Sequence, residues 1–131
     1  MRGNGLPSPE KLQELLRQAS PHRGPWPRIS IWHGTLDSVV APANARAVVD
    51  QWLAVHGLPA EPPSRTSAGG HQRLVWRDGR GRELIESISI AGMNHGTPLN
   101  TRGARGLGHA GPFMLDVGVS STRRIAEGWG I

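Results

Sequence analysis

Several residue types are missing or rare in this sequence. Its 131 residues include no cysteine and no tyrosine, only one phenylalanine and only one lysine. Without cysteine the chain can form neither disulfides nor thiolate metal sites, and the redox state of its compartment stays open. No apolar run approaches the length of a transmembrane helix, and the first five residues do not begin a secretory signal peptide. We therefore expect no membrane span and no targeting signal in this chain.

Basic residues outnumber acidic ones by 15 to 10, which gives a formal net charge of +5. A basic balance of this kind raises the question of a nucleic-acid partner. The arginines are scattered along the chain, however, and no aromatic side chains alternate with them to form a base-stacking surface. Solvated surface charge is the better interpretation. A small non-catalytic basic domain that binds an anionic partner such as nucleic acid remains the alternative.

Serine, proline and glycine mark where the first two helices begin and end. The pair Ser8-Pro9 predicts the start of a short amphipathic helix, because serine caps helices and proline suits the first helical position. A stiff proline-rich connector follows over residues 20–27. Pro42 predicts the start of a second helix, which Gly57 is placed to close.

The expected strands surround the second helix in the sequence. A short apolar strand is predicted over residues 28–33, and residues 71–77 and 83–90 form a hairpin around an Asp-Gly-Arg-Gly turn. Residues 58–70 lack periodicity and predict a surface loop. Ser121 predicts the cap of a last helix. Strand, helix and strand in this order indicate an α/β fold with a crossover connection.

One acidic residue and one histidine each follow an expected strand. Asp37 comes soon after the strand at 28–33, and His95 comes soon after the strand at 83–90. An acid followed by a histidine, each at a strand end, matches two members of the Ser…Asp…His triad of α/β-hydrolases. Each residue alone has a simpler interpretation, since aspartate often forms an Asx-turn at a strand end and loop histidines are often merely exposed. Considered together, each strengthens the case for an acid–base pair, but their spacing alone leaves the simpler interpretations equally open.

Other kinds of site are not predicted. The six histidines show none of the spacings typical of metal ligands, so no metal is expected. The segment Gly106–Gly111 matches the dinucleotide-binding fingerprint, but no strand precedes it and proline follows it at once, so no cofactor is expected either. The sequence also lacks a Gly-x-Ser-x-Gly nucleophile elbow. The serine of a triad is therefore missing.

Three segments resemble one known family in combination. They are Trp-His-Gly-Thr-x-Asp-x-x-Val-x-Pro at 32–42, Gly-Met-x-His-Gly-Thr-Pro-Leu at 92–99 and Gly-Pro-Phe-Met-Leu-Asp-Val-Gly at 111–118. They resemble the C-terminal half of a polyhydroxybutyrate depolymerase family esterase, which is an α/β-hydrolase. Leu36 and Asn94 stand where smaller residues, alanine and glycine, are commoner in the family, and either could alter the local turn.

The resemblance implies a single partial α/β-hydrolase domain over residues 1–131, the C-terminal portion of its sheet with flanking helices. Residues 1–27 are then a lead-in helix and connector, and residues 28–131 supply a strand, a helix, a hairpin and a helix. It also implies that Asp37 is the triad acid and His95 the triad base of a carboxylic ester hydrolase. The family's nucleophile serine lies in an N-terminal half that is absent here, so this chain is expected to be inactive alone. The implied partners are an ester or polyester substrate and the missing half, and members of the family are commonly secreted.

Overall fold

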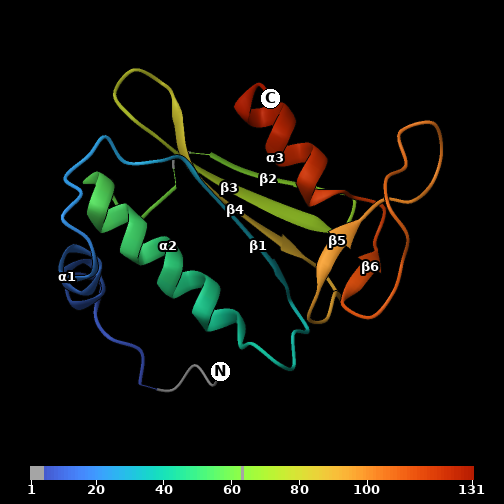
Figure 1. The fold of residues 1–131 in the computed structure, drawn as a ribbon, viewed down its shortest axis with the longest axis horizontal. Coiled ribbons are helices and arrows are strands. Elements are labelled where there is room, and N and C mark those ends of the chain that lie inside the picture. The colour runs from blue at the N-terminus through green and yellow to red at the C-terminus, as the bar shows by residue number, and fades with distance from the viewer. Residues whose placement is uncertain (1–4, 63) are drawn as a thin grey trace.

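The computed structural model describes residues 5–62 and 64–131, and the start of the predicted lead-in, residues 1–4, lies outside the described residues. Four strands form one mixed sheet in the order β1-β4-β3-β2 (Figure 1). Their bounds are β1 Ile29–Gly34, β2 Ser64–Ala68, β3 His71–Arg77 and β4 Glu83–Ile90. Strand β1 runs parallel to β4, and β4 runs antiparallel to β3. The crossover connection and the hairpin that the sequence predicted are both confirmed.

Three helices accompany the sheet: α1 Pro9–Ala19, α2 Pro42–His56 and α3 Ser121–Trp129. The side chain of Ser8 accepts a hydrogen bond from the backbone N–H of Lys11, so this predicted cap is confirmed. Gly57 ends α2 in the left-handed conformation, as expected. No helix of the described residues combines the length and the apolar character that crossing a membrane requires.

The predicted cap of the last helix was one residue too late. Ser120 caps α3, and its side chain accepts a hydrogen bond from the backbone N–H of Arg123. Ser121 is the first helical residue instead, and its buried hydroxyl donates to the carbonyl of Pro98. Adjacent serines carry the same capping signal, so the direction in which each side chain points decides which of them acts as the cap.

Residues 58–70 were wrongly predicted to be loop throughout. Residues 64–68 of this stretch form β2, which pairs antiparallel with β3. The strand reads Ser-Arg-Thr-Ser-Ala, so it shows no alternation of apolar and polar residues. Backbone pairing with β3 holds it at the edge of the sheet. Two further strands of three residues, β5 Thr97–Leu99 and β6 Met114–Asp116, form a separate parallel pair.

Two apolar clusters support this arrangement. The first lies between α2 and the sheet and is built on the buried side chains of Val49, Leu53, Trp76 and Ile85. The second gathers Met93 and Val119 with the C-terminal part of β4. Helix α1 packs against α2 on its outer side (Figure 1). Side chains of this kind stabilise a fold by about 1.5–3 kcal/mol each when fully buried.

A chain of polar side chains crosses three strands of the sheet. Ser30 of β1 and Glu86 of β4 are register partners, and the Ser30 hydroxyl donates to Glu86 Oε1 over 2.6 Å. The indole N–H of Trp32 donates to the same hydroxyl oxygen. From β3, Arg73 Nε donates to Glu86 Oε2 over 2.8 Å. Glu86 is therefore bonded to both of its neighbouring strands.

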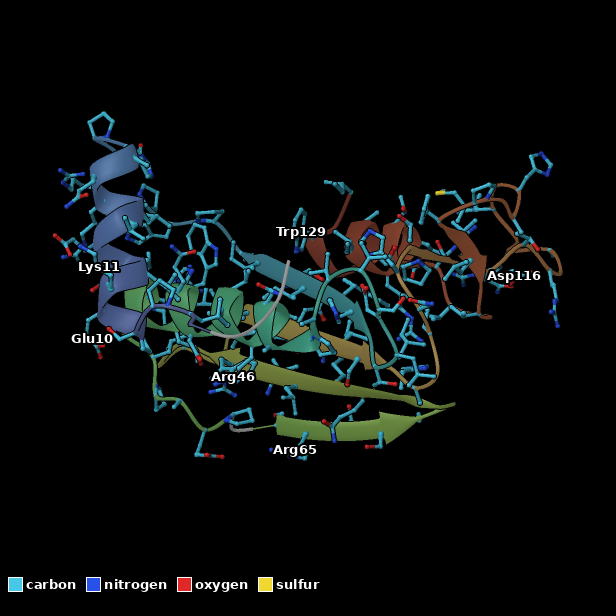
Figure 2. The ribbon with its side chains drawn as sticks, turned by 90° about the horizontal axis from the view of Figure 1, so that it is seen from below. Glu10, Lys11, Arg46, Arg65, Asp116 and Trp129 are labelled. Atoms are coloured by element: carbon cyan, nitrogen blue, oxygen red, sulfur yellow. The ribbon has the colours of Figure 1, made fainter. Side chains whose placement is uncertain are left out.

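Figure 2 shows the two sides of the molecule, with Trp129 at the end of α3 on one side and Arg65 of β2 on the other.

Candidate active site

The end of β1 lies tightly against the segment that follows β4. A Cβ atom added to Gly34 would lie 2.1 Å from the carbonyl oxygen of Met93, so only glycine fits at this position. Next to it, the N–H of Thr35 donates to the carbonyl of Ile90, and the N–H of Leu36 donates to the carbonyl of Met93. These contacts bring the loop after β1 beside the loop after β4. The two predicted site residues lie on these two loops.

The carboxylate of Asp37 is held by both of its oxygens. Oδ1 accepts hydrogen bonds from the N–H groups of Val39 and Val40, over 2.9 and 2.7 Å. Oδ2 lies 2.9 Å from Nδ1 of His95. The side chain is only 4% exposed. The two interpretations of this aspartate, an Asx-turn and a partner for histidine, therefore apply at once, one for each oxygen.

Opposing influences act on the pKa of Asp37. Its burial raises the pKa, but the hydrogen bonds from Val40, His95 and Val39 outweigh that effect and lower the pKa to about 2. The group is therefore a carboxylate at neutral pH and can only accept hydrogen bonds. It follows that Nδ1 of His95 carries the shared proton, which fixes the tautomer of the imidazole.

The other nitrogen of His95 is available for chemistry. The side chain is 38% exposed, and Nε2 makes no hydrogen bond with any of the described residues. The imidazole and the ring of Phe113 form a T-shaped pair, with the two ring centroids 5.8 Å apart. Phe113 itself is 62% exposed and adopts a left-handed backbone conformation, φ 60°, which is rare for a bulky residue. The imidazole thus stands between a buried carboxylate and an exposed aromatic ring.

Sequence reasoning missed the part that Asn94 plays in the site. Its Oδ1 accepts hydrogen bonds from the backbone N–H and the hydroxyl of Ser38 and from the N–H of His95. The side chain of Leu36, the other residue singled out by the family comparison, is 65% exposed. Asn94 therefore joins the two site loops.

Sequence reasoning also missed His33, the fifth residue of β1. Its Nε2 lies 3.0 Å from the carbonyl of Val40 and 3.6 Å from Oδ2 of Asp37. A histidine four residues before the aspartate is the only sequence signal that could have found it. In the described part of the chain, no group of three or more histidine or acidic side chains is arranged to hold a metal ion.

Comparison with known proteins supplies a relative. No family model matches the chain. The chain is 42% identical to poly(3-hydroxyalkanoate) depolymerase C of Paucimonas lemoignei over 113 residues. These residues make up 86% of this chain and 27% of that protein. The chain resembles a polyhydroxybutyrate depolymerase family esterase. The match is with the C-terminal portion of such proteins.

Esterases with other named substrates are similar as well. An acetylxylan esterase of Coprinopsis cinerea is 33% identical over 97 residues, which cover 73% of this chain and 26% of the esterase. The chain therefore spans about a quarter of the length of these depolymerase-family and esterase relatives.

A solved structure supports the fold. The acetyl xylan esterase from Aspergillus awamori matches with a TM-score of 0.62 over 71% of this chain and 34% of that chain, at 23% identity. At this identity the likeness shows the fold alone. The mixed α/β architecture is confirmed, whereas the division into a lead-in and a triad-bearing part stays a prediction.

Proposed function

We propose that this chain supplies the acid and the base of a serine esterase of the polyhydroxybutyrate depolymerase type, with Asp37 as the acid and His95 as the base. The observation that carries the proposal is the 2.9 Å contact between Asp37 Oδ2 and His95 Nδ1, made by a carboxylate whose other oxygen is fixed by two backbone N–H groups. The nucleophile serine and the donors that stabilise the oxyanion belong to a portion of the esterase outside this chain.

The geometry suits the steps of ester hydrolysis. Nε2 of His95 takes the proton of the serine hydroxyl while the serine oxygen attacks the ester carbonyl. Asp37 stabilises the resulting imidazolium through the Nδ1 hydrogen bond. The imidazolium then gives the proton to the leaving alcohol, and an acyl-serine remains. Water, deprotonated by His95, attacks the acyl-serine and releases a carboxylic acid and the free serine.

The substrate class follows from the chemistry that the relatives share. Their names refer to a poly(3-hydroxyalkanoate) and to acetylated xylan, which have carboxylic esters in common. We therefore propose a carboxylic ester or polyester as the substrate. Since none of the described serines hydrogen-bonds to Nε2 of His95, we expect the 131-residue chain alone not to turn over ester.

A chimaera tests the proposal. The segment of the Paucimonas lemoignei depolymerase that matches this chain is replaced by this chain, and hydrolysis of a short p-nitrophenyl ester is measured. The chimaera is expected to be active, and His95→Ala should lower kcat by about 10⁴-fold or more. His109→Ala is the matched control, because His109 is exposed in the segment Gly106–Gly111 and forms no hydrogen bond or ion pair with Asp37 or His95.

Two results would contradict the proposal. One is a folded chimaera in which His95→Ala is as active as the unchanged protein. The other is ester hydrolysis by the 131-residue chain alone together with stoichiometric labelling by a serine-directed phosphonate, because the nucleophile would then lie within this chain.

A further inference from the structure

His33 lies near the end of β1 and makes one well-formed hydrogen bond. Its Nε2 is 3.0 Å from the carbonyl oxygen of Val40, and its side chain is 15% exposed. A carbonyl oxygen can only accept, so Nε2 must carry a proton. The contact therefore selects the Nε2–H tautomer of neutral His33 and closes the loop from Gly34 to Val40 across its base.

Val40 is held at both of its backbone groups. Its carbonyl accepts from His33, and its N–H donates to Oδ1 of Asp37 over 2.7 Å, the shorter of the two backbone contacts to that carboxylate. A shift of Val40 would therefore move the anchor of the carboxylate. Through this residue, His33 is linked to the orientation in which Asp37 presents its other oxygen to His95.

A second contact of His33 is electrostatic. Its Nε2 lies 3.6 Å from Oδ2 of Asp37, which is longer than a hydrogen bond but close enough for the polar nitrogen to interact with the carboxylate charge. The same oxygen faces Nδ1 of His95 at 2.9 Å. Oδ2 thus has two imidazole nitrogens close to it, the nearer one from the loop after β4 and the farther one from β1.

We propose that His33 is a positioning residue for the Asp37–His95 pair: its Nε2–H holds Val40 in place, and Val40 holds the carboxylate in line with Nδ1 of His95. The inference rests on the proposed function, because it assigns His33 a part in the same triad. Its first test needs no catalysis, since the hydrogen bond between Asp37 and His95 can be observed directly.

The first experiment follows the Nδ1 proton of His95 by NMR in the 131-residue chain labelled with ¹⁵N-histidine. In the unchanged chain this proton should be shifted downfield and protected from exchange with water. His33→Phe removes the donor to Val40, and the signal should be lost. His33→Gln keeps an N–H donor, and the signal should return.

The matched control is His56→Phe. His56 also places Nε2 3.0 Å from a carbonyl, that of Pro27, but it lies at the end of α2 away from Asp37. Losing this bond should leave the His95 signal unchanged. If the His95 Nδ1 signal persists in His33→Phe, the inference is overturned and the proposed function stays intact. If the folded unchanged chain shows no such signal, the proposed function itself is contradicted.

Two further measurements keep the test decisive if His33→Phe does not fold. The ¹⁵N shifts of His33 in the unchanged chain should report the Nε2–H tautomer, and an Nδ1–H tautomer would overturn the inference. In the chimaera, His33→Phe should lower kcat on the order of 10²-fold with KM unchanged, as expected for a misplaced catalytic group, and His33→Gln should restore it. An unchanged kcat would overturn the inference as well.

Discussion

Asn94 and Ser38 join the two loops of the candidate site through a single oxygen atom. Oδ1 of Asn94 accepts from the backbone N–H of Ser38 over 3.0 Å and from its hydroxyl over 3.2 Å. The same oxygen accepts from the N–H of His95 over 2.8 Å. Three donors from two loops thus converge on one amide. The residue next to the histidine is therefore connected to the residue next to the aspartate.

Removing this acceptor should loosen the connection at a modest cost in stability. Asn94→Ala is expected to lower the free energy of unfolding by about 1 kcal/mol, because the freed donors are exposed and water can replace the amide oxygen. Asn94→Asp keeps an acceptor oxygen and should lose less. Urea unfolding of the three proteins measures the difference, and equal stability of Asn94→Ala and the unchanged chain would contradict the expectation.

Gly34 should tolerate no side chain. In Gly34→Ala the new Cβ would lie 2.1 Å from the carbonyl oxygen of Met93, so the backbone of one site loop must move. We expect a loss of about 3 kcal/mol or more in unfolding free energy. Gly79→Ala is the matched control, because the same change there meets nothing within 4 Å. Urea unfolding of both variants provides the comparison, and similar losses in the two would argue against the tight contact.

The stability that Asp37 contributes should depend on pH in a defined window. Its pKa in the folded chain is about 2, below the ordinary value of 3.8. A lowered folded-state pKa means that the stabilisation is fully present above pH 4 and is lost as the pH falls through 2. The difference in unfolding free energy between the unchanged chain and Asp37→Asn should therefore shrink between about pH 4 and pH 2. A difference that stays constant from pH 7 to pH 2 would contradict the assigned hydrogen bonds.

The arginines should give little affinity for polyanions, because carboxylates of the same chain neutralise many of them. Among the described residues the arginine ion pairs are Arg46–Asp50, Arg73–Glu83, Arg73–Glu86, Arg77–Glu83, Arg82–Asp78, Arg102–Asp116 and Arg105–Glu127. We expect no retention of the chain on heparin at about 0.15 M salt. Glu83→Gln removes the carboxylate partner of Arg77 and one of the two partners of Arg73, so it should increase retention. Strong, salt-dependent retention of the unchanged chain would instead favour the alternative of a basic binding domain.

Local signals in the sequence were enough to predict most of the regular structure. Pro42 and Gly57 mark the two ends of α2, because proline suits a first helical turn and glycine readily adopts the left-handed conformation that closes a helix. The hairpin of β3 and β4 follows from its turn and its apolar residues. These signals act over a few residues, so a single sequence reveals them.

The elements that were missed depend on their partners. The residues of β2 are small or polar, and the strand forms because β3 offers a free row of backbone groups beside it. The three-residue strands β5 and β6 are likewise defined by pairing with each other. Nothing in their own sequences distinguishes them from loop.

In the candidate site too, some residues could be found from local sequence and others depend on contacts between distant segments. The closeness of Asp37 and His95 could be predicted because each follows a strand, and parallel strands bring their carboxyl ends to one edge of a sheet. The contacts of Asn94 with Ser38 span 56 residues, and that of His33 with Val40 spans a loop whose path the sequence does not reveal. Supporting residues of this kind become visible only when the loops are seen together.

The hydrogen bond between Ser30 and Glu86 affects the alignment of the two loops that follow β1 and β4. These residues face each other across the parallel strands β1 and β4. A slip of two residues would keep every side chain on its own face, so the apolar pattern alone would not prevent it. It would separate Ser30 from Glu86 and move the end of one strand past the other by about 6.6 Å. Asp37 and His95 would then lie out of reach of each other, so this half-buried polar contact helps to keep the two residues of the candidate site aligned.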